Sequence, residues 1–287
     1  MSKKPNDYRA LVREHYRKEA LSEGKEPTST MRDLTTRRAE VAEILSYLID
    51  GDRCLEVGCG NGFASVQIAK AKKLSMTCID FSSELIALAK KQSTKGIKGR
   101  IAFSKQDILK LQCTNKYNVV FTVRCIINLL DWNDQKEALR RMARALKKGG
   151  RLILLEAYKD GNQELNRARH EIGLPQIPPA YHNLHLEKEK VAEYLSSQGL
   201  TLKEENNFLS TYYFGSRVLY PALAGIAKKK VTHNSAFSQF FANLPPAGNY
   251  SHIKILAFTK KEPLTDSAAV TTERRSEICS MSRARKF

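Results

Sequence analysis

The sequence lacks several features that would assign the chain to whole classes of protein. No apolar run approaches the roughly 20 residues that a membrane-spanning helix needs. The N-terminal stretch has no apolar segment of the kind found in a secretory signal, and the six cysteines include no C-x-x-C pair. We therefore expect a cytoplasmic protein with reduced, mostly buried cysteines, without a disulfide framework and without a metal site.

Acidic residues are scarce relative to basic ones. The chain has 48 Lys and Arg against 30 Asp and Glu, which gives a net charge of +18. Such a charge attracts anionic partners such as nucleic acid, membrane surfaces or phosphorylated substrates. The basic residues are spread over several predicted helices with few aromatics among them, which favours a solvated surface. An anionic acceptor and nucleic acid stay open as partners, nucleic acid being the less favoured, and the oligomeric state is not predicted.

Strand and helix patterns alternate between residues 53 and 156. Apolar runs predict strands at 53–57, 75–80, 100–104, 117–123 and 151–156. Helical spacing predicts helices at 62–71, 83–92 and 133–147, the last one ended by Gly149-Gly150. The alternation indicates an α/β protein with a Rossmann-like, doubly wound parallel sheet.

The flanking segments have a different pattern. We expect a helix at 6–22, irregular chain at 158–186, a helix at 187–198, strands at 200–208 and 251–260, and short helices at 216–227 and 235–243. This divides the chain into an N-terminal helical lid (1–38), a ligand-binding domain (39–262) and a disordered polar tail (263–287). Insertions at about 158–198 and 211–250 are expected to cover the substrate.

The most informative segment is DRCLEVGCGNG, residues 52–62. A short apolar strand carrying Glu56 breaks into Gly58, Cys59, Gly60 and, after Asn61, Gly62, and a helix follows at once. Such a glycine turn lets a ligand approach the backbone at a helix N-terminus. A dinucleotide-binding loop would need a third glycine at position 63, where this chain has phenylalanine. The run E-V-G-C-G-N-G instead resembles motif I of the class I S-adenosylmethionine-dependent methyltransferases.

The resemblance implies S-adenosylmethionine as cofactor and a seven-stranded sheet whose last strand is antiparallel. Asp80, at the end of the second predicted strand, would accept hydrogen bonds from the two ribose hydroxyls. Further contacts are implied by position: Phe81 and Ile108 against adenine, Gln106 and Asp107 at its edge, and Val123 and Arg124 beside the methionine moiety.

The segment TMRDLTTRRAE, residues 30–40, also resembles the lead-in helix of bacterial members that act on small molecules and sugars. Arg32 and Asp33 would then reach the amino-acid end of the cofactor. Methyl transfer needs no covalent nucleophile, but a base that takes the acceptor proton helps. His182, and second to it His185, are the predicted bases, since PPAYHNLHLEKEK (residues 178–190) resembles acceptor-site segments of related enzymes.

The predicted function is therefore methyl transfer to a hydroxyl, or an amine, of a small-molecule or sugar-type acceptor. Two alternatives stay open, an RNA or DNA methyltransferase and a non-catalytic S-adenosylmethionine-binding module. The sequence after the fourth strand reads VRCI, which lacks both the Asn/Asp-Pro-Pro-aromatic run of adenine-N6 enzymes and the Pro-Cys of cytosine-C5 enzymes. A dehydrogenase is disfavoured by Phe63.

Overall fold

The computed structural model describes residues 5–22, 24, 32–232 and 234–261. Its centre is a seven-stranded sheet in the order β3-β2-β1-β4-β5-β7-β6. The strands are β1 (Arg53–Val57), β2 (Ser75–Asp80), β3 (Arg100–Lys105), β4 (Tyr117–Val123), β5 (Leu146–Ala157), β6 (Leu200–Asn206) and β7 (Ile253–Lys260). Strands β1 to β5 pair in parallel, and β7 is antiparallel to both β5 and β6. The predicted fold class is confirmed. The predicted tail at 263–287 lies outside the described residues.

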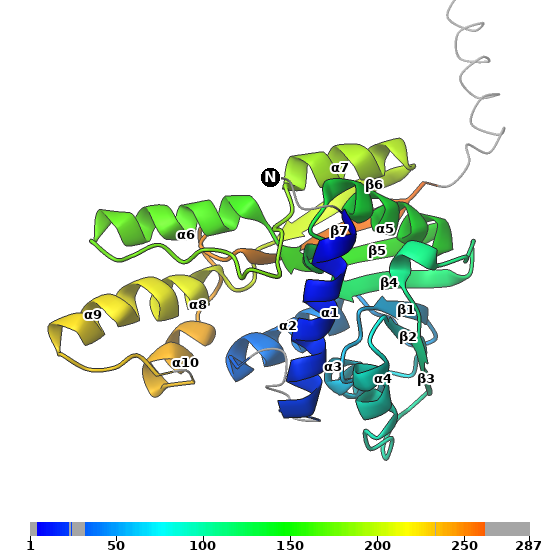
Figure 1. Cartoon of the computed structure of the whole chain (residues 1–287), viewed down its shortest axis with the longest axis horizontal. Coiled ribbons are helices and arrows are strands. Elements are labelled where there is room, and N and C mark those ends of the chain that lie inside the picture. The colour runs from blue at the N-terminus through cyan, green and yellow to red at the C-terminus, as the bar shows by residue number, and fades with distance from the viewer. Residues whose placement is uncertain (1–4, 23, 25–31, 233, 262–287) are drawn as a thin grey trace, which may run out of the picture.

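Helices cover both faces of the sheet (Figure 1). The helices of the alternating part are α2 (Leu34–Ser46), α3 (Phe63–Ala71), α4 (Ser83–Lys90) and α5 (Trp132–Ala145), joined by the short turns η1 (Ile108–Lys110) and η2 (Ile126–Asn128). Successive strand residues point to opposite faces. In β4, Val120 therefore packs with α5, whereas Val119 and Phe121 pack with α2 and α3. Because both faces are buried, these strands are almost wholly apolar.

The remaining helices are α1 (Pro5–Ser22), α6 (Lys159–Glu171), α7 (Lys188–Ser197), α8 (Ser210–Phe214), α9 (Tyr220–Ile226) and α10 (Ala236–Ala242). A π-helical turn, η3 (Gly215–Leu219), joins α8 to α9. In Figure 1, α6, α9 and α10 extend beyond the sheet on one side, and α1 crosses in front of the molecule between them and α4. Within the described residues, no helix combines the length and apolarity needed to cross a membrane.

Two local predictions were wrong. Residues 158–186 were expected to be irregular, yet they contain α6, a very polar helix whose buried positions are Gly161, Leu165 and Arg169. So little apolar periodicity gives no helix signal in the sequence. The pair Gly149-Gly150 does not end a helix but lies within β5, where the pairing with β4 shifts between Tyr117 and Val119. Glycine tolerates this kind of bulge, and Gly149 has a φ of 71°.

Candidate functional site

The glycine loop between β1 and α3 shapes one wall of a pocket. Gly58, Gly60 and Gly62 all have positive φ, at 79°, 55° and 76°. A Cβ on Gly58 would lie 2.4 Å from Sγ of Cys125, so only glycine lets the loop pack against the end of β4. A Cβ on Gly60 would meet nothing within 4 Å, and Gly60 lines the pocket. The loop therefore leaves open space next to its backbone.

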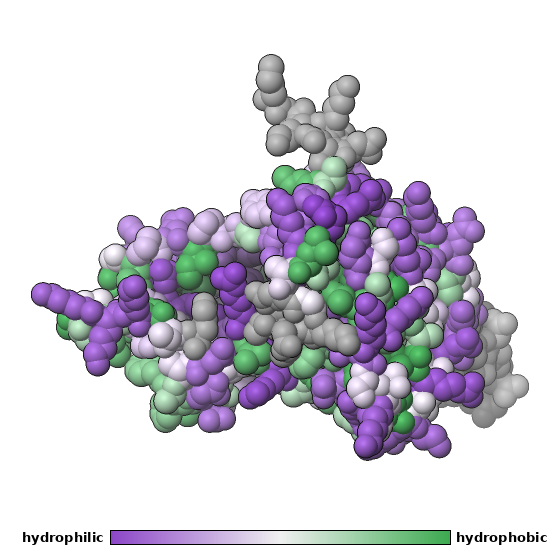
Figure 2. Space-filling view, turned by 60° about the horizontal axis from the view of Figure 1, so that its bottom comes forward, coloured by the Kyte–Doolittle hydropathy of each residue, from purple (hydrophilic) through white to green (hydrophobic). Residues whose placement is uncertain are grey.

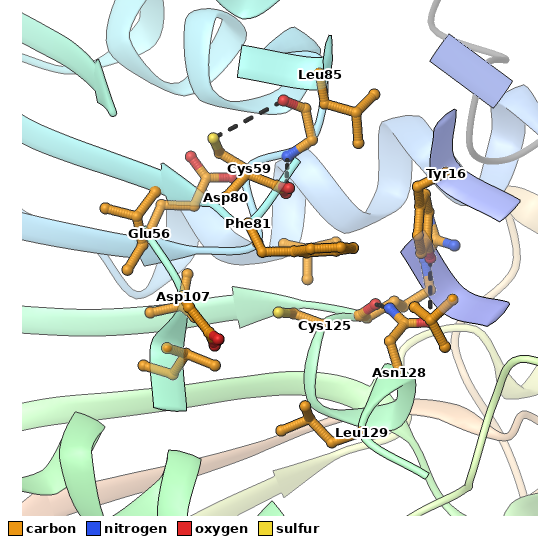
Figure 3. Close-up of a pocket in the computed structure, with 18 of the residues that line it drawn as sticks. Tyr16, Glu56, Cys59, Asp80, Phe81, Leu85, Asp107, Cys125, Asn128 and Leu129 are labelled. Atoms are coloured by element: carbon orange, nitrogen blue, oxygen red, sulfur yellow. Dashed lines mark hydrogen bonds between the residues drawn. The ribbon is translucent and has the colours of Figure 1, made fainter. Parts of the chain in front are cut away.

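Asp80 ends β2 and holds this loop. Its carboxylate is buried, with Oδ2 accepting from the backbone N of Gly60 at 2.9 Å and Oδ1 from that of Ser82 at 2.9 Å. Burial raises the pKa of Asp80 to about 6. Figure 3 shows Asp80 beside Cys59 and Glu56 at the pocket wall. Glu56 is also buried, its Oε2 has no hydrogen-bond partner among the described residues, and burial raises its pKa.

The pocket lies at the carboxyl ends of β1, β2 and β4, where ligands bind in open parallel sheets. Most of the predicted cofactor residues line it: Glu56, Gly58, Cys59, Gly60, Asp80, Phe81, Gln106, Asp107, Ile108, Val123 and Arg124. Gly62 is not in the lining. A Cβ on Gly62 would lie 2.9 Å from Cβ of Ala89, so its position is set by packing against α4.

Helix α1 closes the pocket from outside. Arg9 pairs with Asp107, and the Tyr8 hydroxyl donates to Asp134 on α5. Further along, the Tyr16 ring lies edge-on to Phe81 at 6.4 Å, and its hydroxyl donates to Oδ1 of Asn128 at 3.1 Å (Figure 3). Sequence reasoning missed Tyr16, because nothing in its local sequence links it to residues more than 60 positions away.

Arg37 of α2 lines the pocket, whereas Arg32, which precedes that helix, does not. Arg32 is exposed and outside the lining, and its neighbour Asp33 caps α2 and accepts from Tyr212 and Arg217. Arg37 is 7% exposed and lines the pocket. Its Nη1 donates to Glu40 at 3.4 Å, while its Nε has no hydrogen-bond partner among the described residues. Helical spacing could have predicted this position. Arg37 follows the buried N-cap residue Asp33 by one helical turn, so both lie on the inward side of α2.

Arg124 directly follows β4. Its φ of 52° is a left-handed backbone conformation that residues other than glycine rarely adopt. Its Nε donates to Oε1 of Glu40 at 2.7 Å, so Glu40 is shared by the buried Arg37 and the half-buried Arg124. The turn η2 that follows is held by Glu156, which accepts from the backbone N of Cys125, Ile126 and Ile127 at 3.0, 3.0 and 3.4 Å. Backbone strain of this kind persists where the surroundings enforce it.

The predicted bases lie outside the pocket lining. His182 is half-buried and stacks on His15 of α1 at 3.8 Å. His185 is buried and stacks on His252, at the start of β7, at 5.2 Å. In all three rings, His182, His185 and His252, Nδ1 is buried without a partner among the described residues. Burial lowers the pKa of His182 and of His185 to about 4 and that of His252 to about 3. His252 was not predicted.

Known proteins resemble the central part of the chain. Residues 54–150 match the family model of the methyltransferase domain. Together with the E-V-G-C-G-N-G loop, this match identifies residues 54–150 as a class I S-adenosylmethionine-dependent methyltransferase domain. An O-methyltransferase of Aspergillus nomiae is 32% identical over 145 residues, covering 49% of this chain and 62% of that protein. The 27-O-demethylrifamycin SV methyltransferase of Amycolatopsis mediterranei is 29% identical, covering 44% of this chain and 46% of its own length.

The fold agrees with this assignment. Magnesium protoporphyrin IX methyltransferase from Synechocystis, solved with bound S-adenosylhomocysteine, superposes with a TM-score of 0.58, covering 88% of this chain and all of that one at 14% identity. The cofactor predicted for this methyltransferase domain, S-adenosylmethionine, is confirmed by the family. The chain spans 46–65% of the length of the first three curated relatives it matches.

Proposed function

We propose that this chain is an enzyme that transfers a methyl group from S-adenosylmethionine to a hydroxyl, or an amine, of a small-molecule or sugar-type acceptor. The observation that carries the proposal is Asp80, buried at the pocket wall with each carboxylate oxygen oriented by a backbone N–H. When bound, the cofactor supplies an electrophilic methyl group on a sulfonium. The chain therefore has to align the two reactants, exclude water and accept a proton.

The residues of the pocket fit this cofactor. Asp80 has remaining acceptor capacity for the ribose hydroxyls, and the open space beside Gly60 admits a ligand close to the backbone. Phe81 and Ile108 offer apolar surface for adenine. Arg37 lines the pocket, and its Nε has no hydrogen-bond partner among the described residues, so its guanidinium is suited to the cofactor carboxylate. Asp107 already accepts from Arg9 and from the backbone N of Leu109, so its contact with the adenine amino group stays a prediction.

Helix α1 is proposed to act as the lid over this pocket. It reaches the pocket with Tyr8, Arg9, Val12, Arg13 and Tyr16, and it is held by contacts to Asp107, which also lines the pocket, and to Asp134 of α5. Excluding water in this way strengthens polar interactions inside the site.

His182 and His185 remain the proposed proton acceptors on the acceptor side, and we add His252. Their lowered pKa values leave the rings neutral at physiological pH, which is the form that can accept a hydrogen bond from a hydroxyl. Glu156 and Tyr158 are poor candidates. The Glu156 carboxylate is occupied by three backbone N–H groups, and the Tyr158 hydroxyl donates to Leu154 inside the core.

The proposal is tested by calorimetry with S-adenosylhomocysteine. Asp80→Ala is expected to weaken binding about 30- to 1000-fold, because two hydrogen bonds from the ribose to a carboxylate are lost. Asp50→Ala, which removes an exposed carboxylate that accepts from the backbone N of Lys73, is the matched control and should leave the affinity unchanged. An Asp80→Ala protein with a native circular dichroism spectrum and wild-type affinity would contradict the assignment, as would preferential binding of NAD.

A further inference from the structure

One strongly exposed apolar segment lies far from the pocket, at the C-terminal end of α9. In this segment, Ile226 is 81% exposed, Leu223 51% and Val231 46%. Lys228, Lys229 and Lys230 lie between them in the chain and are all exposed. We call residues 223–231 the α9 tip. Large apolar side chains are seldom left so exposed in a group, and such groups mark interaction sites.

The α9 tip is a defined structure. Helix α9 ends with the backbone N of Lys229 bonded to the carbonyl of Ala224 at 2.8 Å, and Lys228 adopts the left-handed conformation with a φ of 52°. This is the pattern of a Schellman-type helix end. Leu223 and Ile226, three residues apart, share one side of the helix. The turn therefore holds three lysines beside Leu223 and Ile226, which we call the apolar ridge.

The side of α9 that faces α10 is already packed. The ring of Tyr220 stacks on Phe237 of α10 at 5.0 Å, and Phe237 contacts Phe241 at 5.2 Å. A Cβ on Gly215 would lie 2.1 Å from the Phe241 ring, so α10 packs tightly against the turn before α9. Figure 1 shows α9 projecting from the body, and Figure 2 shows apolar patches beside long hydrophilic side chains at that end of the molecule. The apolar ridge is thus left without a partner within the described residues.

We propose that the α9 tip docks this protein on an anionic lipid bilayer, with Leu223, Ile226 and Val231 entering the interface and the three lysines contacting lipid phosphates. Apolar residues flanked by Lys on a projecting helix end have the chemistry of peripheral membrane anchors. The proposal is independent of the proposed reaction.

Other occupants fit the α9 tip less well. Nucleic acid without sequence preference is held by basic grooves with stacking aromatics, and residues 223–231 contain no aromatic side chain. A second copy packed across a two-fold axis would bring two sets of three lysines together. Three apolar side chains are also few for a protein interface, which normally buries about 800 Å² on each partner.

The test is co-sedimentation of the full chain with vesicles of phosphatidylglycerol and phosphatidylcholine, compared with pure phosphatidylcholine. The wild type should bind the anionic vesicles at least about tenfold more tightly. Lys228→Glu/Lys229→Glu/Lys230→Glu should lower that affinity about 100-fold, and Ile226→Asp about tenfold or more. The matched controls are Lys90→Glu/Lys91→Glu/Lys95→Glu, three exposed lysines at the end of α4, and Ile49→Asp, an apolar side chain 61% exposed elsewhere.

Three results would overturn the proposal. The first is equal binding to both vesicle types, or none. The second is an equal loss in the Lys90, Lys91 and Lys95 variant, which would assign binding to the net charge of the whole surface. The third is a wild-type dimer in light scattering that Ile226→Asp converts to a monomer, which would assign the α9 tip to self-association. Retained circular dichroism spectra confirm that each variant is folded.

Discussion

The region that forms the pocket and the C-terminal region, residues 158–260, are built in different ways. From β1 to β5, functional groups come from strand ends and from the backbone of a glycine loop, and the key carboxylate, Asp80, is oriented by N–H groups next to it. In the C-terminal region, polar side chains from different elements are buried against one another. Lys254 of β7, fully buried, donates to Asp160, Glu205 and Asn249 at 2.7–2.9 Å. The first arrangement leaves polar groups at the pocket wall, whereas the second holds β6, β7 and α6 together.

The largest expected effect concerns His182 in the C-terminal region. If His182 accepts the acceptor proton, His182→Ala should lower turnover about 10²- to 10⁴-fold while the affinity for S-adenosylhomocysteine stays nearly constant. His170→Ala, which removes an exposed histidine of α6, is the control. Turnover and calorimetry are measured on the same preparations. Full turnover in His182→Ala would return this histidine to a structural role, and the same pair of measurements on His185→Phe and His252→Phe would follow.

A second test asks whether Glu156 is structural. In Glu156→Gln the new amide NH₂ would face either the backbone N–H of Ile127 or those of Cys125 and Ile126, so at least one donor would lose its acceptor. We expect a loss of about 1–3 kcal/mol in the free energy of unfolding, measured by urea denaturation. Glu189→Gln on the surface of α7 should cost less than about 0.5 kcal/mol. Unchanged stability together with a large loss of turnover would instead make Glu156 a base.

A third test separates two arginines. Arg37→Met should weaken binding of S-adenosylhomocysteine about 10- to 100-fold, because a buried charge-assisted contact to the cofactor carboxylate is lost. Arg32→Met should have no effect, since Arg32 is exposed outside the pocket lining. Calorimetry of both variants decides the matter. The reverse order of effects would favour the arginine that the sequence alone suggested.

The sequence predicts the strands and the glycine loop well, but it does not predict contacts between elements that are far apart in the chain. The strands 53–57, 75–80 and 117–123 have the bounds expected from the sequence, because burial on both faces leaves an apolar run between clear breaks. Asp80 was found because its distance from the glycine loop fixes its place at the sheet edge. Arg37, Tyr16 and His252 were missed because each reaches its neighbours through contacts between elements far apart in the chain. No local pattern records such contacts.

The smallest effect is a pH dependence of cofactor binding. Burial raises the pKa of Asp80 to about 6, so the carboxylate becomes protonated as the pH falls through that value and loses acceptor capacity. Affinity for S-adenosylhomocysteine should fall about tenfold between pH 7 and pH 5, a dependence that Asp80→Asn should abolish. The stability of the unbound protein depends on pH in the opposite direction. The folded-state pKa exceeds the unfolded value, so the contribution of Asp80 to stability is lost as the pH rises from about 4 to about 6.

The central claim is that the pocket at the carboxyl ends of β1, β2 and β4 holds the methyl donor. A crystal structure of the full chain with S-adenosylhomocysteine tests it most directly. We predict that the ribose lies on Asp80, the adenine between Phe81 and Ile108, and the carboxylate within hydrogen-bond distance of Arg37. Density for the ligand elsewhere on the chain, or a ribose that makes no contact with Asp80, would contradict it.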